Sequence, residues 1–261
     1  EYLSKWTSRL HYRQIERGIT QATHIVTPSL ATKADIVQLL NISGNRITEI
    51  ALGVDERFFQ RFTPDHLERA LQEYGLTPGY LYHGGGLEIR KNTEAVLRVY
   101  AELVREEIPD LPPLVISGKI HREDNPLATP VTKLMHELDL EEKVKLLGLV
   151  PEDHLPLLYQ GASMFLFPSR YEGFGLPVLE AWASGTPVIT TRAGSLGELV
   201  SPGEALLIED RGAMEYELKA HIKQLIAQPE LGHTLAGRGL EHAKQYRWET
   251  FSQKVRQCLL Q

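Results

Sequence analysis

Six short, almost uninterrupted runs of apolar residues constrain the fold of this chain more than any other feature. They alternate with amphipathic stretches such as 93–107, where Val96, Val99 and Leu103 fall on one helical face. Strands without a polar face are typical of a sheet covered on both sides. We therefore predict an α/β fold with a doubly wound, parallel, Rossmann-like sheet. The predicted strands are 80–83, 113–117, 143–148, 164–168, 187–191 and 205–209.

The first 56 residues follow a different pattern. A long helix over about residues 2–22 precedes a strand at 23–28, a helix at 30–40 and a strand at 46–52. These elements are too few to close a sheet, so we expect the chain to be a fragment that begins with the last elements of another α/β domain. Residues 53–65 carry the turn and charge pattern of a linker. We expect one unit at residues 1–56 and a second at 57–261.

The composition excludes several classes of protein. A formal net charge of −6 and a pI of about 6.0 argue against a nucleic-acid partner. Cys258 is the single cysteine, so an internal disulfide is excluded and a reducing compartment is favoured. No apolar run approaches the roughly 20 residues of a membrane span, and the charged first residues do not form a secretory signal. We expect a cytoplasmic protein.

Two carboxylates stand eight residues apart in the segment PSRYEGFGLPVLEAWASG. Pro177 suits the first position of a short helix and Gly185 the position after its end. Glu172 then lies in the loop and Glu180 on the helix, near the carboxyl edge of the sheet where ligands bind. The pair could accept hydrogen bonds from a hydroxyl-rich ligand. Alternatively, Glu172 pairs with Arg170 and Glu180 complements the helix dipole.

A basic pair follows a glycine-rich turn in the segment YLYHGGGLEIRKNTEAV. Gly85 and Gly86 let the backbone approach a ligand closely. Arg90 and Lys91 precede a helix for which Asn92 is a suitable N-cap. The two cations could clamp a diphosphate from one side, or they could form a solvated basic pair.

Metal-dependent and covalent hydrolase chemistry both lack their usual residues. The sequence contains no Asp-x-Asp and no Cys/His grouping with metal-ligand spacing, so we expect neither a metal nor another cofactor. It also contains no Gly-x-Ser-x-Gly. His83 ends a strand beside the glycines, and we interpret it as a structural histidine.

The stretch PSRYEGFGLPVLEAWASGTPVITT resembles the E-x7-E motif of retaining glycosyltransferases with GT-B architecture, the group 1 or family-four enzymes. The resemblance extends from about Ser29 to the C-terminus and includes GLVPEDHLPLLYQGASMFLFPS and GSLGELV. Enzymes of this group have two facing Rossmann-like domains, one for the acceptor and one for a nucleotide-sugar donor. The resemblance implies that this chain holds the donor domain and the last elements of the acceptor domain.

The same resemblance implies a role for each residue of the two motifs. Glu172 would lie at the donor sugar and Glu180 would hold the ribose hydroxyls. Arg90 and Lys91 would neutralise the departing diphosphate without a metal. The usual Gly-Arg-Leu pattern is altered, because Gly86 stands where the family has its first arginine.

Further donor contacts are implied in the neighbouring loops. The nucleobase would be framed by Gly118, Lys119 and Val150, and the phosphates and sugar by Gly85, Gly86, Phe174, Gly175, Leu176, Ser195 and Leu196. The implied reaction transfers a hexose from a nucleoside diphosphate to a hydroxyl of a glycan or lipid-linked glycan. The form GGLEIRKN resembles mannosyltransferases that use GDP-mannose. The alternatives are a nucleotide-sugar-binding module that is inactive alone, and a GT-B phosphorylase or epimerase.

A basic stripe recurs every four residues on the first predicted helix, at Lys5, Arg9, Arg13 and Arg17. Because acceptors of the resembling family are often lipid-linked, weak peripheral contact with the anionic inner face of a membrane is one interpretation. A solvated helix face is the other.

Overall fold

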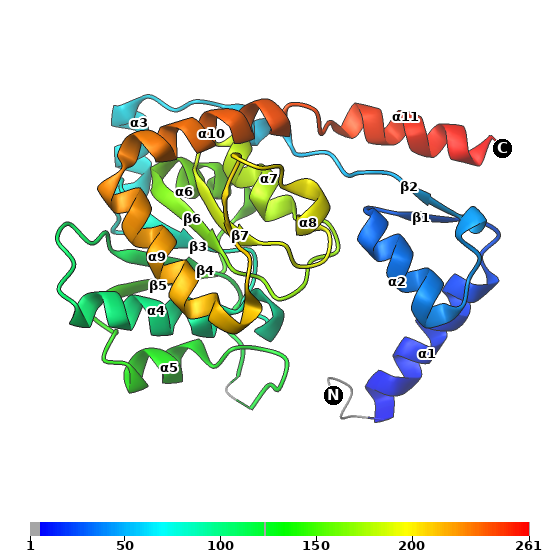
Figure 1. The fold of residues 1–261 in the computed structure, drawn as a ribbon, viewed down its shortest axis with the longest axis horizontal. Coiled ribbons are helices and arrows are strands. Elements are labelled where there is room, and N and C mark those ends of the chain that lie inside the picture. Colours follow the sequence, from blue (N-terminus) through cyan, green and yellow to red (C-terminus); the bar gives the residue numbers. More distant parts are fainter. Residues whose placement is uncertain (1–5, 123, 261) are drawn as a thin grey trace.

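The structure is a computed structural model that describes residues 6–122 and 124–260. Within these residues, parallel strands form a six-stranded sheet in the order β5-β4-β3-β6-β7-β8 (Figure 1). The strands are β3 (Tyr80–His83), β4 (Leu114–Ser117), β5 (Val144–Gly148), β6 (Ala162–Phe167), β7 (Val188–Thr191) and β8 (Leu206–Ile208). Each coincides with a predicted run to within two residues, so the predicted parallel α/β sheet is confirmed.

The strand order reverses between β3 and β6. These strands pair directly, with Leu81 opposite Met164, although they are far apart in the sequence. The chain proceeds outward from β3 through β4 to β5, and then from β6 through β7 to β8 in the other direction. In an open α/β sheet such a reversal places the ligand-binding crevice beyond the carboxyl ends of the two central strands.

Helices cover both faces of the sheet. They are α3 (Pro64–Gln72), α4 (Thr93–Arg105), α5 (Val131–Glu137), α6 (Leu155–Gly161), α7 (Leu176–Ala183), α8 (Leu196–Leu199), α9 (Met214–Ala227) and α10 (Pro229–Ala243). The last helix, α11 (Trp248–Leu259), has no buried residue and extends away from the sheet (Figure 1). In α4 the predicted apolar face is buried, with Val96, Val99 and Leu103 at most 1% exposed.

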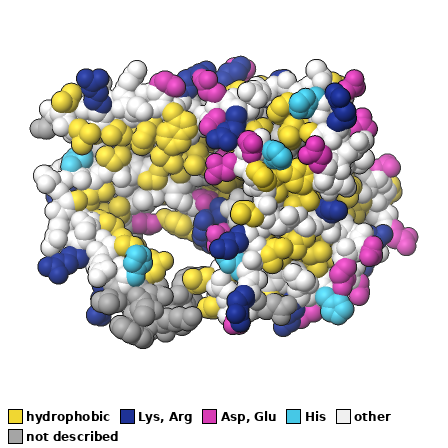
Figure 2. Space-filling model, turned by 180° about the vertical axis from the view of Figure 1, so that it is seen from behind, with side chains coloured by type: hydrophobic (Ala, Val, Ile, Leu, Met, Phe, Trp, Pro, Cys, Tyr) yellow, Lys and Arg dark blue, Asp and Glu magenta, His cyan; other side chains and the backbone are white. Residues whose placement is uncertain are grey.

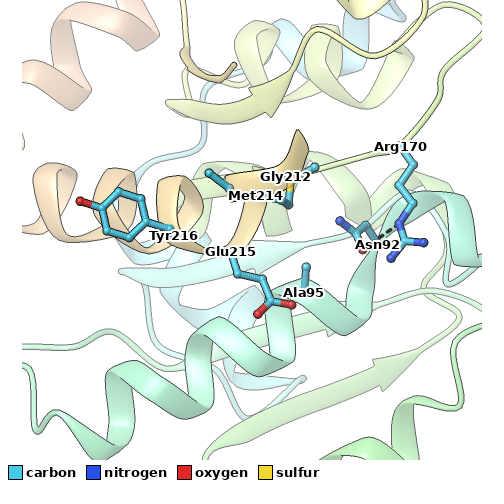
Figure 3. A pocket seen from close by; sticks show the side chains of 8 residues that line it. Asn92, Ala95, Arg170, Gly212, Met214, Glu215 and Tyr216 are labelled. Atoms are coloured by element: carbon cyan, nitrogen blue, oxygen red, sulfur yellow. Dashed lines mark hydrogen bonds between the residues drawn. The ribbon is translucent and has the colours of Figure 1, made fainter. Parts of the chain in front are cut away.

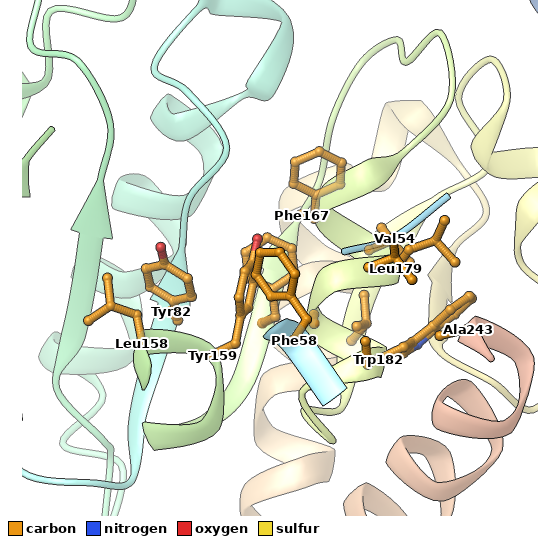
Figure 4. Close-up of a cluster of buried hydrophobic side chains, with 14 of the residues drawn as sticks. Val54, Phe58, Tyr82, Leu158, Tyr159, Phe167, Leu179, Trp182 and Ala243 are labelled. Atoms are coloured by element: carbon orange, nitrogen blue, oxygen red, sulfur yellow. The ribbon is translucent and has the colours of Figure 1, made fainter. Parts of the chain in front are cut away.

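Alternate side chains of the central strands enter two separate cores, as expected for a pleated strand. Tyr82 and Phe167 join a cluster with residues of α6, α7 and α10, including Trp182 (Figure 4). Leu81 and Leu166 point to the opposite face and join residues of α4, α5 and α9. The doubly wound arrangement is therefore confirmed.

The N-terminal part (residues 6–52) forms a separate small unit in Figure 1. It consists of α1 (Trp6–Gln21), β1 (Ile25–Thr27), α2 (Leu30–Leu40) and β2 (Ile47–Glu49), and its two strands pair in parallel. Of the basic stripe, Arg13 and Arg17 are exposed on α1, whereas Lys5 lies outside the described residues. Across residues 6–122 and 124–260, no helix has both the length and the apolar character needed to cross a membrane.

The predicted linker at 53–65 is more ordered than its composition indicated. It contains a 3-10 helix, η2 (Glu56–Phe59), and the start of α3. Phe58 is 5% exposed, and its ring centroid lies 5.9 Å from that of Tyr159 in the core. The chain also returns to this segment near its end, because the Val54 amide donates to the Tyr246 carbonyl at 3.1 Å. The segment therefore contributes to the core, and its role as a linker between two units stays a prediction.

Candidate functional site

The loops that follow β3, β4 and β6 meet at the carboxyl edge of the sheet. Gly86, after β3, lies against Gly118, after β4, since a Cβ on Gly118 would stand 3.3 Å from Gly86 Cα. Gly85 lies against α7, and a Cβ there would stand 2.9 Å from Pro177 Cγ. Gly85 and Gly86 have φ values of 86° and 113°, which glycine adopts without strain. Residues predicted from three separate motifs thus form one continuous surface.

A charged cluster forms where the β3 and β6 loops meet. Glu172 Oε1 accepts a hydrogen bond from Lys91 Nζ at 2.7 Å and from Ser169 Oγ at 2.6 Å. Arg90 Nη1 donates to the other oxygen, Oε2, at 2.9 Å. The residues predicted as a carboxylate and a basic pair are therefore in direct contact with one another. The interpretation that Glu172 pairs with Arg170 is wrong.

The two cations of the cluster differ in accessibility. The side chain of Lys91 is 4% exposed and its ammonium lies 4.6 Å from the centre of the Phe167 ring, whereas the Arg90 side chain is 46% exposed. Burial lowers the pKa of Lys91, and the neighbouring Glu172 carboxylate opposes this effect. Arg90 is therefore the cation of this cluster that is more accessible to solvent.

Backbone and amide contacts fix the relative position of the two loops. The Arg170 amide donates to the Arg90 carbonyl at 2.7 Å, and Asn92 Nδ2 donates to the Pro168 carbonyl at 3.2 Å. Asn92 occupies the predicted N-cap position with φ of 61°, but its side chain does not cap α4. Its Oδ1 instead accepts from Arg170 Nε at 3.1 Å. A cavity of about 440 Å³ lies beside this pair, between α4 and the start of α9 (Figure 3).

Glu180 is the fifth residue of α7 and therefore lies beyond the first helical turn, so a dipole contact there does not explain it. Tyr159 donates a hydrogen bond to Glu180 Oε2 at 3.1 Å. Burial raises the pKa of Glu180 to about 7, although the Tyr159 hydroxyl and the nearby Lys91 charge both act to lower it. The helix itself begins at Leu176, so Pro177 takes its second position rather than the predicted first.

The turn after β7 contacts the loop that carries Glu172. The Ser195 amide and hydroxyl both donate to the Glu172 carbonyl, at 3.1 and 3.0 Å. Leu196 is fully buried, and a Cβ on Gly175 would lie 2.8 Å from its Cδ2. Phe174 is 8% exposed and packs edge-on against Tyr246. The predicted residues of this region are therefore brought together.

The residues expected to frame a nucleobase lie farther along the same edge. The Gly118 amide donates to the Gly148 carbonyl at 2.8 Å, which joins the ends of β4 and β5. Lys119 is exposed and borders a cavity of about 870 Å³, lined by residues 119–122 and 124–126. Val150 is 8% exposed and belongs to the core beneath α6 and α7, so its side chain is not available at the surface.

His83 is fully buried, and both of its ring nitrogens have partners. Nδ1 lies 2.8 Å from the Leu166 carbonyl and Nε2 lies 2.9 Å from Thr93 Oγ1. Burial lowers its pKa to about 4, so the ring is neutral near pH 7. These contacts agree with a structural histidine.

Three residues of the site were missed by the sequence analysis: Ser169, Tyr159 and Phe167. Ser169 is the second residue after β6, and this position at a strand end was the only available signal. Tyr159 and Phe167 were hidden in apolar runs. Over the part of the chain that the structure describes, no group of three or more His, Cys, Asp or Glu side chains is arranged to hold a metal ion.

Figure 2 shows an opening between the N-terminal part and the part built on the six-stranded sheet, with acidic and basic side chains along its border. The sheet order and the fold match the C-terminal half of GT-B glycosyltransferases. The chain belongs to the family of glycosyl transferases group 1, whose family model matches residues 71–242.

Two curated relatives show how much of a longer protein the chain represents. The O-antigen chain mannosyltransferase B of Escherichia coli is 34% identical over 250 residues, covering 95% of this chain and 63% of the relative. A D-inositol 3-phosphate glycosyltransferase of Rhodococcus opacus is 29% identical over 244 residues, covering 91% of this chain and 53% of the relative. The chain thus spans between about half and just under two thirds of the length of these relatives.

Solved structures match the fold over nearly the whole chain. HepE of Anabaena, in complex with UDP and glucose, superposes with a TM-score of 0.78 at 22% identity, covering 91% of this chain and 63% of HepE. Sucrose-phosphate synthase of Thermosynechococcus elongatus gives 0.80 at 22% identity, covering 99% of this chain and 62% of the synthase. At 22% sequence identity, the structural similarity to these two proteins establishes the fold alone.

Proposed function

We propose that this chain is the donor-binding portion of a retaining glycosyltransferase that moves a hexose from a nucleoside diphosphate to a hydroxyl acceptor. The observation that carries the proposal is the cluster of Glu172, Arg90 and Lys91, with Glu180 at the same edge of the sheet. Membership of the glycosyl transferases group 1 supports it. Residues 57–261 are proposed as the donor domain and residues 1–56 as the end of the acceptor-side domain.

In this proposal the basic pair stabilises the departing diphosphate. Negative charge develops on the diphosphate as the glycosidic bond breaks, and fixed cations in a water-poor crevice stabilise that charge strongly. Arg90 is half exposed and can turn toward a phosphate directly. Lys91 remains buried against Glu172 and adds positive potential from beneath. Amides near Gly85, Gly86 and Leu196 supply further donors, and no metal is needed for this step.

Glu172 and Glu180 would each bind a different sugar of the donor. Glu172 is held by two cations and Ser169, and this arrangement would orient its carboxylate toward hydroxyls of the hexose. Glu180 would accept the ribose hydroxyls, and each charge-assisted hydrogen bond contributes about 1.5–3 kcal/mol. Gly118, Lys119 and Val150 would frame the base, and Phe174, Gly175, Leu176 and Ser195 would shape the wall around the sugar.

For the donor itself we propose GDP-mannose. The form GGLEIRKN and the mannosyltransferase name of the relative at 34% identity favour mannose. UDP-glucose is the second candidate, because HepE, which shares the fold, is described in complex with it. The acceptor would be a hydroxyl of a glycan or lipid-linked glycan in polysaccharide synthesis. We place the protein in the cytoplasm, with Arg13 and Arg17 available for weak contact with an anionic membrane.

The titration and turnover experiments described below also test two alternative functions. The chain could be a binding module that needs the rest of an acceptor-side domain for turnover, since the relatives are longer. A GT-B phosphorylase or epimerase would use the same fold but would give product with inorganic phosphate, or without an acceptor.

Calorimetric titration of the chain with GDP, UDP, ADP, GDP-mannose and UDP-glucose tests the proposal. We expect one nucleotide and its sugar to bind clearly, and Glu180→Ala to weaken that binding at least tenfold, or about 1.4 kcal/mol. In the whole enzyme, Lys91→Ala and Glu172→Ala are expected to abolish most turnover. Normal turnover of both variants would refute the assigned roles, and transfer by the 261-residue chain alone would refute the inactive module.

A further inference from the structure

Residues of α2 and its N-cap contact the loop that carries Glu172. Ser29, the N-cap of α2, donates from its hydroxyl to the Gly173 carbonyl at 2.7 Å. Thr32 Oγ1 donates to the same carbonyl at 3.1 Å. Tyr171 donates to the Asp35 carboxylate. The N-terminal part therefore holds the residues on either side of Glu172.

The turn after β7 holds the same backbone from the other side. The Ser195 amide and hydroxyl donate to the Glu172 carbonyl, and Glu172 forms a parallel bridge with Gly194. Gly194 has φ of 61°, and a Cβ there would stand 2.4 Å from the Glu172 carbonyl oxygen. The fit between this turn and the loop is therefore too close for a side chain.

Glu198 of α8 binds the N-terminus of α2, so α2, the Glu172 loop and α8 are connected in a closed ring of contacts. Its carboxylate accepts from the Leu30 amide at 3.1 Å and from the Ala31 amide at 2.9 Å. These are N-terminal amides of α2, which have no partner within the helix and favour a negative charge. The ring runs from α2 to Gly173, through Glu172 to α8, and back to α2. We call Ser29, Thr32, Ser195 and Glu198 the latch.

Buried hydrogen bonds contribute to the geometry of the latch. Ser29 is 3% exposed and Ser195 is fully buried, and such hydroxyls are costly without partners. A cavity of about 200 Å³ lies directly beside them, lined by Ser29, Ser195, Glu198 and Phe174 among others. Because this cavity leaves free space beside the latch, loss of a hydrogen bond would give the loop room to move.

We propose that Ser29 and Glu198 are positioning residues for Glu172, acting through the latch. The carboxylate of Glu172 is held by Arg90 and Lys91, whereas the carbonyl of the next residue, Gly173, is held from α2. The position of the group that faces the donor sugar thus depends on contact with the N-terminal part. The proposal rests on the proposed function only where it assigns Glu172 to the sugar.

The Ser29→Asp substitution distinguishes the effect of the latch on Glu172 from the effect of Ser29 as a helix N-cap. Ser29→Asp retains an N-cap for α2, because aspartate caps as well as serine, but its carboxylate cannot donate to the Gly173 carbonyl. Ser29→Thr keeps a hydroxyl and is the rescue variant. Glu198→Ala opens the ring at the other side. Thr63→Ala removes a comparable N-cap from α3, away from the site, and is the control.

Hydrogen exchange and calorimetry of the 261-residue chain test the proposal. In Ser29→Asp and Glu198→Ala we expect about tenfold faster exchange of the Ser195 amide and about fivefold weaker binding of GDP-mannose, with binding of GDP unchanged. Ser29→Thr and Thr63→Ala should behave like the parent chain. Unchanged exchange in both latch variants, or equal weakening of GDP and GDP-mannose, would overturn the proposal. If the parent chain binds no nucleotide, the proposed function fails and the exchange result alone decides whether the latch exists.

Discussion

The proton of the buried Glu180 carboxyl is expected to make the stability of this fold depend on pH. Burial raises the pKa of Glu180 to about 7 from an ordinary value of 4.5. The folded chain therefore binds this proton more tightly than the unfolded chain. The resulting stability is fully present below about pH 4.5 and is lost as the pH rises through 7.

The size of the effect follows from the two pKa values. The interval from 4.5 to about 7 corresponds to about 3 kcal/mol of unfolding free energy, at 1.36 kcal/mol per pH unit. Roughly 2.5 kcal/mol of this falls between pH 5 and pH 8. Glu180→Gln removes the titrating group but keeps an acceptor for the Tyr159 hydroxyl. The variant should therefore gain about 2.5 kcal/mol relative to the parent chain across this range.

Urea unfolding of both chains at pH 5, 6, 7 and 8 measures this difference. Groups common to both chains, including the buried His83, cancel in the comparison. Glu68→Gln, at an exposed position on α3, is the control for removal of one carboxyl charge. A Glu180→Gln difference that stays the same from pH 5 to pH 8 would refute the argument, because the carboxyl would then titrate alike in the folded and unfolded chains.

Two further predictions concern packing and charge. Glu172→Gln leaves the buried Lys91 ammonium without its counter-charge, so urea unfolding at pH 7 should show a loss of about 3–5 kcal/mol; a loss below about 1 kcal/mol would contradict the ion pairing. A Cβ on Gly239 would lie 2.2 Å from Trp182 Cδ1, so Gly239→Ala should lower stability by about 1–3 kcal/mol. Gly237→Ala on the same helix meets no atom within 4 Å and should raise stability by about 0.5–1 kcal/mol, and the opposite order of the two variants would refute this packing.

The sheet and its functional edge could be predicted because their signals are local. Each strand is covered on both faces, so its sequence is a continuous apolar run that needs no knowledge of its neighbours. Gly118 follows such a run directly, Gly85 stands two residues after one, and Glu172 stands four residues after one. Parallel strands end at one edge, and this is why residues from distant motifs could be assigned to one site before their contacts were known.

The partners of these residues could not be predicted, because they depend on which strands are neighbours. Glu172 was paired with nearby Arg170 in one interpretation, whereas it contacts Arg90 and Lys91 across the β3–β6 junction. Phe58 was assigned to a linker because charged and turn-forming residues surround it, although its ring enters the core. The contact of Ser29 with Gly173 joins residues 144 positions apart and leaves no pattern in the sequence.

The assignment of Glu180 to a ribose can be tested with a double-mutant cycle. The parent chain and Glu180→Ala are each titrated with GDP and with 2′,3′-dideoxy-GDP, or with the uridine pair if UDP binds instead. We predict that loss of the hydroxyls weakens binding to the parent chain at least tenfold, about 1.4 kcal/mol, and leaves binding to Glu180→Ala almost unchanged. Equal weakening of both chains by the dideoxy ligand would contradict the assignment, because the carboxylate and the ribose hydroxyls would then act independently.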